Sequence, residues 1–358
     1  MKILRPISIV VCLCLPAAGA TAQTQLLPPP GAPAPAAKAA KPAKAKIIKP
    51  AAKKPAAAAT PAKPQLPPSP PSPATPAVTE DPNADVVFGA YQRGQYKTAF
   101  DLATARAANG DPKAMAMLGE LYSGGLGVKR DFAKAADWYK RAADLGDREA
   151  MFALAMLRIS GRGGPANREE GAKLLASSAK LGSSKAAYNL ALLYLDGQTL
   201  PQDLKRAAEL MRISADAGNP EAQYALATFY KEGTGVPKDI EKAVRLLQAA
   251  SLADNVDAEV EYAIALYNGT GTPKNETAAV ALLRKAARQN SPIAQNRLAR
   301  VLVTGAGAPV DKVEGLKWHI VAKTAGKGDL MLDEALAQAS PEERTKAEDA
   351  ARKWLGAK

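Results

Sequence analysis

The sequence repeats itself with a period of 36 residues over most of its length. The segment Gly218–Ala253, GNPEAQYALATFYKEGTGVPKDIEKAVRLLQAASLA, is the type copy. Glycine, or aspartate or asparagine in its place, marks the same register at Gly110, Gly146, Gly182, Gly218, Asp254, Asn290 and Gly326. A period in this range is typical of stacked-helix solenoids, so the repeat decides the fold class before any other feature.

Small residues recur at fixed places in the first half of each copy. One column is Ala114, Ala150, Ala186, Ala222, Ala258 and Ala294, and a second is Gly119, Ala155, Ala191, Ala227, Ala263 and Ala299. In the type copy Ala222, Leu226, Ala227 and Tyr230 are three or four residues apart, which places them on one face of a helix. The glycines that close this half, such as Gly233, favour a left-handed helix cap.

The second half of each copy predicts a second helix. It starts at an Asp or Asn, whose side chain accepts first-turn amide hydrogens: Asp131, Asn167, Asp203, Asp239, Asn275 and Asp311. Its inner face in the type copy is Ala243, Leu246, Leu247 and Ala250, and the alanines allow close helix approach. We therefore predict an all-α, right-handed superhelix of helix-turn-helix repeats. Its six full copies are 110–145, 146–181, 182–217, 218–253, 254–289 and 290–325, within 110–326.

The array has irregular ends. Residues 83–109 read as a degenerate first copy, with helices near Asp85–Gln92 and Tyr96–Asn109. Residues 327–358 predict two capping helices, one over Asp329–Ala339 and one that starts with a capping box at Ser340 and ends near Leu355. Atypical terminal copies are what a solenoid needs to cover its ends.

Residues 1–22 have the pattern of a secretory signal peptide. Lys2 and Arg5 precede the short apolar stretch Ile7–Leu15, and Ala20-Thr21-Ala22 forms a small-x-small cleavage site. The apolar stretch is far shorter than the roughly 20 residues that span a bilayer. We therefore predict cleavage after Ala22, export to the periplasm and no transmembrane segment in the mature chain. Both cysteines would leave with the peptide.

Residues 23–82 consist mainly of proline, alanine and lysine. Such a segment has too few large apolar side chains to offset its ordering entropy, so we expect a disordered, extended linker. Its eight lysines dominate the basic balance, since from residue 83 onward the surplus is only five. The linker is either a solvated spacer or an arm whose Lys38–Lys63 region binds anionic envelope polymers. It has no aromatic residues for base stacking, so a nucleic-acid partner is not expected.

The repeat itself resembles a known family. Gly-Asn-x-Glu-Ala-Gln-Tyr-x-Leu-Ala, then Tyr-x-x-Gly-x-Gly-Val-x-x-Asp and Lys-Ala at 242–243, is similar to the Sel-1-like repeat, a branch of the tetratricopeptide-repeat superfamily. The resemblance covers about residues 84–326. It implies a non-enzymatic adaptor or regulator that binds other proteins in a concave groove. With the export signal, it also resembles periplasmic regulators of membrane sensor kinases.

Some residues depart from the family pattern. Arg158 stands where other copies carry Tyr122 or Tyr194, and Thr199 replaces the second turn glycine. Cysteine-rich members, once linked to β-lactams, bridge each repeat with a disulfide. The repeats of this chain contain no cysteine, so that activity is not carried over.

Little in the sequence favours catalysis, a metal site or a cofactor. The single histidine, His319, lies beside Trp318 without a recognisable partner motif, so we expect a packed or surface histidine. The Gly-x-Gly pairs lack the preceding strand of a phosphate-binding loop and are interpreted as helix-ending turns. A hydrolase stays a distant alternative, which would require His319 and a carboxylate in one cleft.

The family resemblance places the first helices on the groove. Mapped onto this sequence, the positions are Phe152, Met156, Ile159, Tyr188, Leu192, Leu195, Glu221, Tyr224, Thr228, Lys231 and Glu232. Phe152, Tyr188 and Tyr224 form an aromatic row, which is what a bound helix or extended peptide would use as anchors. The alternative is that these rings pack between repeats. The expected partner is a protein or peptide, with a membrane sensor protein as one candidate.

Overall fold

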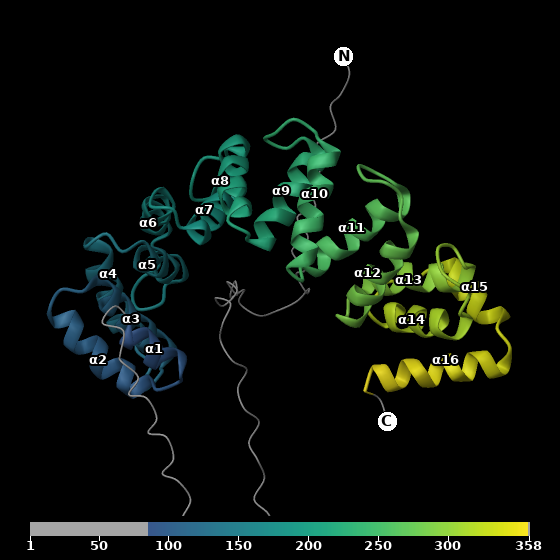
Figure 1. Cartoon of the computed structure of the whole chain (residues 1–358), viewed down its shortest axis with the longest axis horizontal. Coiled ribbons are helices and arrows are strands. Elements are labelled where there is room, and N and C mark those ends of the chain that lie inside the picture. Colours follow the sequence, from purple (N-terminus) through teal and green to yellow (C-terminus); the bar gives the residue numbers. More distant parts are fainter. Residues whose placement is uncertain (1–84, 357–358) are drawn as a thin grey trace, which may run out of the picture. The chain divides into compact units, whose positions relative to one another are not determined.

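The computed structural model describes residues 85–356. The predicted signal peptide and the linker with its Lys38–Lys63 region lie outside the described residues. The described part contains sixteen helices and no strand (Figure 1). The helices are α1 Val86–Gln92, α2 Tyr96–Ala108, α3 Pro112–Gly124, α4 Phe132–Asp144, α5 Arg148–Ser160, α6 Arg168–Lys180, α7 Ser184–Asp196, α8 Leu204–Asp216, α9 Pro220–Glu232, α10 Ile240–Leu252, α11 Val256–Asn268, α12 Glu276–Arg288, α13 Pro292–Thr304, α14 Lys312–Thr324, α15 Leu330–Gln338 and α16 Pro341–Trp354.

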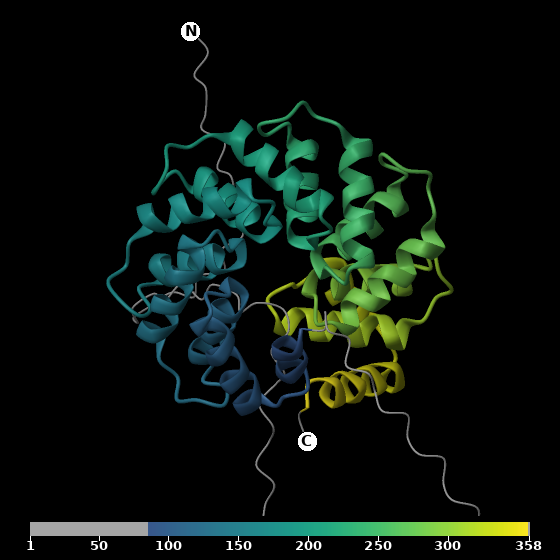
Figure 2. The same cartoon turned by 60° about the vertical axis from the view of Figure 1, so that its left-hand side comes forward.

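From α1 to α14 the helices form successive antiparallel pairs, and each packs mainly on its neighbours in sequence (Figure 2). The last helix, α16, packs on α14. Every copy from α3–α4 to α13–α14 has a first and a second helix of 13 residues each. Equal lengths let each pair stack on the next without a gap. The predicted all-α, right-handed solenoid is confirmed.

Side-chain caps fix where the helices begin. At all six predicted starts of the second helices the Asp or Asn side chain accepts a first-turn amide, as Asp239 does from the Lys242 N–H at 2.9 Å. The first helices have the same device one residue after each marker, where Asn219 accepts from the Ala222 N–H at 2.7 Å. Each helix of the array therefore carries its own start signal.

The marker positions all adopt left-handed backbone conformations. Where glycine is replaced, Asp254 has φ 60° and Asn290 has φ 63°. Asp and Asn are the residues that tolerate this region best after glycine, so the copies keep the turn through a conservative exchange.

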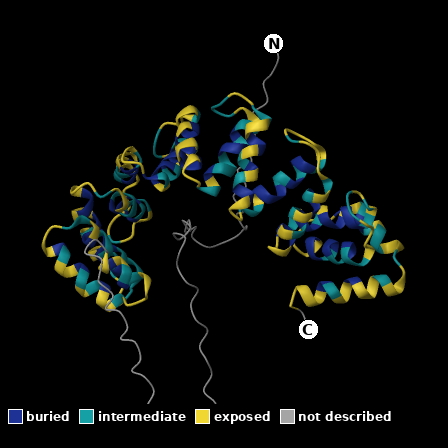
Figure 3. Cartoon of the chain, in the orientation of Figure 1, coloured by how far each residue is buried: buried dark blue, intermediate teal, exposed yellow. Residues whose placement is uncertain are grey.

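The core lies between the helices, where small and large residues are matched copy by copy (Figure 3). Gly119 faces the Tyr139 ring, and a Cβ on this glycine would lie 2.5 Å from the ring. Elsewhere alanine fills the column of Gly119 and Leu175 or Leu247 fills that of Tyr139. Thus the largest side chain in one column is opposed by the smallest in the other.

The two glycines of each turn have different roles. The first, such as Gly233, is the left-handed cap of the first helix. The second approaches the preceding repeat, because a Cβ on Gly235 would lie 2.1 Å from the Leu204 carbonyl oxygen at the start of α8. At Thr199 the hydroxyl instead accepts a hydrogen bond of 3.0 Å from Arg168 Nε at the start of α6. The turn therefore ends a helix and also joins two copies.

The C-terminal helices α15 and α16 follow the last copy. Ser340 forms the capping box of α16 with Glu343. Trp354 of α16 meets Trp318 of α14 edge to face, with ring centroids 5.0 Å apart. Asp329, the N-cap of α15, accepts from Asn296 and Arg300 of α13. These contacts attach both helices to the last full repeat.

Candidate partner-binding surface

The predicted site residues all lie on first helices of three consecutive copies. Phe152, Met156 and Ile159 are on α5, whereas Tyr188, Leu192 and Leu195 are on α7. The remaining five are on α9: Glu221, Tyr224, Thr228, Lys231 and Glu232. The 36-residue period puts equivalent members at equal places on parallel helices. The site is therefore a surface that extends across repeats.

The aromatic rings of this surface are half-buried. Phe152 and Tyr188 pack against the core cluster that contains Ala187 and Ala191, and Tyr224 packs against the cluster that contains Ala227 and Ala258. Burial raises the pKa of Tyr188, and the nearby Glu221 carboxylate of the next copy raises it further. The rings thus help to join adjacent repeats and also reach the surface.

Glu261 of α11 is a central polar contact that the sequence prediction missed. The Tyr224 hydroxyl donates to Glu261 Oε1 at 3.2 Å, and Lys231 Nζ donates to Oε2 at 2.7 Å. One carboxylate thus holds two predicted site residues of the preceding copy. The other copies carry Met117, Ala153, Asn189, Ala225 or Arg297 at this position, so the repeat pattern contains no signal for it.

Several predicted residues serve packing. A Cβ on Gly171 of α6 would lie 2.5 Å from Ile159 Cγ1, so Ile159 fills the space between the two helices of its own copy. Leu195 packs on the same core cluster as Tyr188. The Thr228 hydroxyl donates to the Tyr224 carbonyl, one helical turn earlier. These side chains are less accessible to a binding partner than their positions on the helices suggest.

The most accessible members are Leu192, Glu221 and Glu232. Leu192 is 38% exposed at the middle of α7, although it is a large apolar residue. Glu221 and Glu232 are exposed near opposite ends of α9. A first-helix surface that contains an exposed apolar side chain, half-buried rings and exposed carboxylates is chemically suited to contact another protein.

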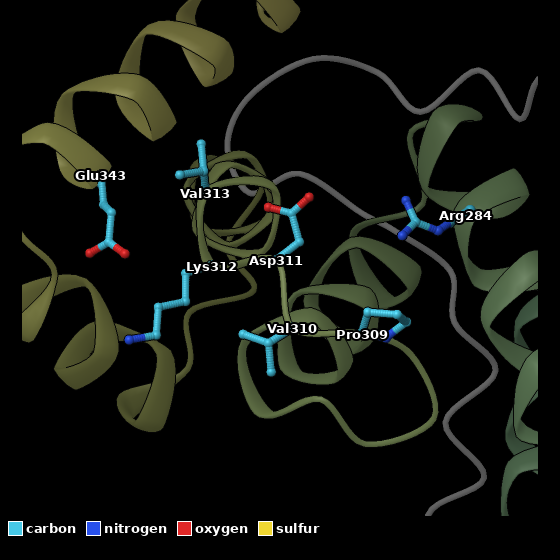
Figure 4. Close-up of a pocket in the computed structure, with 7 residues that line it drawn as sticks. All are labelled: Arg284, Pro309, Val310, Asp311, Lys312, Val313 and Glu343. Atoms are coloured by element: carbon cyan, nitrogen blue, oxygen red, sulfur yellow. The ribbon is translucent and has the colours of Figure 1, made fainter.

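Two hollows of the described part lie away from this surface. One of about 550 Å³ is lined by Arg284, Pro309, Val310, Asp311, Lys312, Val313 and Glu343, around the start of α14 (Figure 4). Another of about 670 Å³ is lined by Tyr122, Val128, Lys129, Arg130, Asp131 and Lys134, around the start of α4. Neither contains a predicted site residue.

His319 is fully buried, with its side chain inaccessible to a substrate. Its Nε2 lies 2.8 Å from Asp333 Oδ1, and Lys323 Nζ lies 2.6 Å from the same oxygen. Hydrogen bonds from Lys323 and then from His319 lower the pKa of Asp333. Of the two predicted alternatives, a packed or a surface histidine, the structure shows the packed one, and its contact joins α14 to α15.

Residues 85–356 contain no group of three or more His, Cys, Asp or Glu side chains arranged to hold a metal ion. In the same range no helix is long and apolar enough to cross a membrane.

Comparison with known proteins identifies the repeat. The sequence matches the Sel1 repeat over six consecutive stretches, 112–147, 148–183, 184–219, 220–255, 256–291 and 292–327. The chain belongs to the Sel1 repeat family. The match has the predicted period and begins two residues after the copies marked by glycine. Sel1 repeats typically serve as protein-interaction scaffolds.

Two solved Sel1-type structures are similar to this one. The first, a Sel1 repeat protein from Oxalobacter formigenes, is 26% identical, with a TM-score of 0.59 over 67% of this chain and 98% of that chain. The second is c5321, described as a protective antigen of uropathogenic Escherichia coli with an SLR fold. It is 26% identical, with a TM-score of 0.53 over 73% of this chain and 64% of that chain. No curated protein matches the sequence.

Proposed function

We propose that this Sel1 repeat protein is a non-enzymatic scaffold or regulator that binds a partner protein through the first-helix surface of α5, α7 and α9. The exposed Leu192, one helical turn after the half-buried Tyr188 on α7, is the observation that carries the proposal. A large exposed apolar side chain gains free energy when a partner covers it.

We also propose that the protein acts in the periplasm after removal of residues 1–22, and that a membrane sensor protein is its partner. The signal-peptide pattern of these residues supports the location. Cell fractionation followed by N-terminal sequencing tests it. A periplasmic chain that begins at Gln23 is expected, and an intact Met1 in the cytoplasmic fraction refutes export.

Binding is tested by site-specific photocrosslinking in intact cells, with the crosslinker at Leu192 or at Leu181. Leu181 is the matched control, because it is an exposed leucine at the end of a second helix, at 49% against 38% for Leu192. A discrete protein should crosslink from position 192 and not from position 181.

The partner is then purified and its affinity measured for Leu192→Glu and Leu181→Glu proteins. The first change should weaken binding at least tenfold, since it places a charge in a desolvated contact. The second should leave binding within about twofold. Equal effects at the two positions would show that the partner binds at another surface.

Truncating Tyr188 or Tyr224 is a less specific test. Both rings contact core clusters, so an alanine there would also loosen the packing between repeats. Leu192 allows the surface to be altered with the core left in place.

A further inference from the structure

One residue of the hollow at the start of α4 sets the first full copy apart from the other five. Two positions before the second-helix cap, five copies have proline: Pro165, Pro201, Pro237, Pro273 and Pro309. The first full copy alone has Lys129 there. A proline that fits a loop stabilises it by about 0.4–1 kcal/mol through the unfolded state. The first copy lacks that stabilisation.

Lys129 adds a third cation to a hollow that already contains two. Lys129, Arg130 and Lys134 are exposed and line one space of about 670 Å³, together with Tyr122, Val128 and Asp131. Three exposed cations that line one hollow create a local positive potential, which attracts an anionic ligand.

The single carboxylate of the hollow supplies little of that counter-charge. Asp131 accepts from the Lys134 N–H at 3.0 Å as the cap of α4, and its other oxygen lies 3.8 Å from Lys134 Nζ. In the fourth copy the equivalent Lys242–Asp239 pair is much closer, at 2.9 Å. Arg130 Nη2 donates only to the Gly124 carbonyl at 3.1 Å, among the contacts of the described residues. The cations of the first copy are therefore poorly neutralised.

We infer that this basic hollow, formed by Tyr122, Val128, Lys129, Arg130 and Lys134, binds an acidic peptide segment of a partner protein. Its cations are exposed, and single exposed ion pairs contribute only about 0–1 kcal/mol. An isolated small anion would thus bind weakly, whereas several linked carboxylates act together. Lys134 Nζ lies over the Tyr122 ring, 5.4 Å from its centroid, so Val128 is the apolar side chain that the hollow offers to a residue between those carboxylates. This apolar contact favours a peptide over an acidic polysaccharide. The site is separate from the surface around Leu192.

The repeats themselves provide the test variants. Lys129→Pro, Arg130→Gln and Lys134→Ala each introduce the residue found at that position in another copy, namely Pro237, Gln202 and Ala278. The described residues show no backbone hydrogen bond from the Lys129 N–H, so proline removes none. The control variant combines Lys238→Gln with Lys242→Ala in the fourth copy, which also has a tyrosine beneath its lysine.

The probe is a fluorescent peptide that alternates glutamate with leucine, and its binding to the full chain is measured by anisotropy at low salt. The triple variant should bind at least tenfold more weakly, the control variant within about twofold, and about 0.5 M salt should abolish binding. Circular dichroism verifies the fold, and Lys129→Pro alone serves if the triple variant unfolds.

Four outcomes overturn the inference. The triple variant binds the acidic peptide as well as the parent chain does, or a lysine-leucine peptide binds equally well. Alternatively, inorganic phosphate at the concentration of the peptide displaces it, which identifies a small-anion site only. Tighter binding of a polygalacturonate chain than of the peptide would also refute the choice of a peptide.

Discussion

The buried carboxylate of Glu259 gives the sharpest test of how this array is stabilised. Glu259 lies on α11 with a fully buried side chain, and Lys285 Nζ of α12 lies 2.7 Å from its Oε1. Lys285 also contacts Asp254, and Gln289 Nε2 donates to both Glu259 oxygens at 3.3 and 3.1 Å. We predict that Lys285→Met destabilises the fifth copy, because it leaves a buried charge with only amide donors.

The size of the expected stability loss follows from how far Glu259 and Lys285 are exposed to water. Removing one partner of a fully buried ion pair costs about 3–5 kcal/mol. Lys285 is 45% exposed, so water screens part of the interaction, and Gln289 keeps its hydrogen bonds. We therefore expect the free energy of unfolding to fall by about 2 kcal/mol.

Neighbouring copies indicate which second substitution should restore the stability lost in Lys285→Met. At the position of Glu259 they have Gln223 and Gln295, whose Nε2 atoms donate to the Ala215 and Ala287 carbonyls at 3.2 and 3.1 Å. Glu259→Gln alone should thus be nearly neutral, and combined with Lys285→Met it should restore most of the stability. The double-mutant cycle should give a coupling of about 2 kcal/mol.

Urea unfolding and amide exchange by mass spectrometry measure these effects. Exchange in α11 and α12 is needed because repeat arrays can open locally rather than in one step. The matched control is Lys140→Met, which breaks a 2.9 Å pair with Asp144 between two largely exposed side chains. It should cost under about 0.5 kcal/mol. An equal loss for both lysines, or no rescue by Glu259→Gln, would refute the reasoning.

Three further predictions concern the turns and the C-terminal cap. In thermal or urea unfolding, Gly235→Ala should lower the free energy of unfolding by at least about 2 kcal/mol more than Gly218→Ala does. Both glycines have positive φ, but only Gly235 has no room for a Cβ. His319→Leu should change stability by less than about 1 kcal/mol in the same assay, because Leu175 and Leu247 fill this column elsewhere and the buried Nδ1 has no partner among the described residues. The pKa values of Asp329 and Asp333 are lowered by Arg300 and Lys323, and that of Glu314 is lowered because hydrogen bonds from Arg284 and Trp318 outweigh its burial. Groups with lowered folded pKa values stabilise above their unfolded pKa of about 4. The protection factors of amides in α15 and α16, which correct for the slower intrinsic exchange at low pH, should therefore fall as pH drops below that value and before those in α7 do.

The sequence predicted the helices because their determinants are local and repeated. The Asp and Asn caps, the alanine columns and the closing glycines act within a few residues, and six copies make each column visible. The role of Gly235 was missed because its cause lies in another copy, where the Leu204 carbonyl leaves no space for a side chain. A contact between repeats cannot be recognised from one column alone.

The site was predicted less well for the same reason. The helix positions of the candidates follow from the period, but their burial depends on what the partner helix carries. Ile159 is held by packing because Gly171 opposes it, and Val303 repeats this pairing with Gly315 in the last copy. Glu261 occupies a column that is alanine in two other copies, so its hydrogen bond with Tyr224 required the structure.

A chain of six similar copies provides its own reference for what the fold requires. Some departures from a column are matched by another residue that restores packing or hydrogen bonding, such as Tyr139 above Gly119, or Arg168 beside Thr199. The contacts of the described residues supply no such compensation for Lys129, which replaces a proline and adds repulsion beside Arg130 and Lys134. A substitution that lowers the stability of the repeat, and that no other residue of the chain compensates, is explained most simply by a contact with another molecule. The same criterion separates the exposed Leu192 from the packed Ile159 and Leu195, and it predicts that function resides where the copies differ without a structural reason.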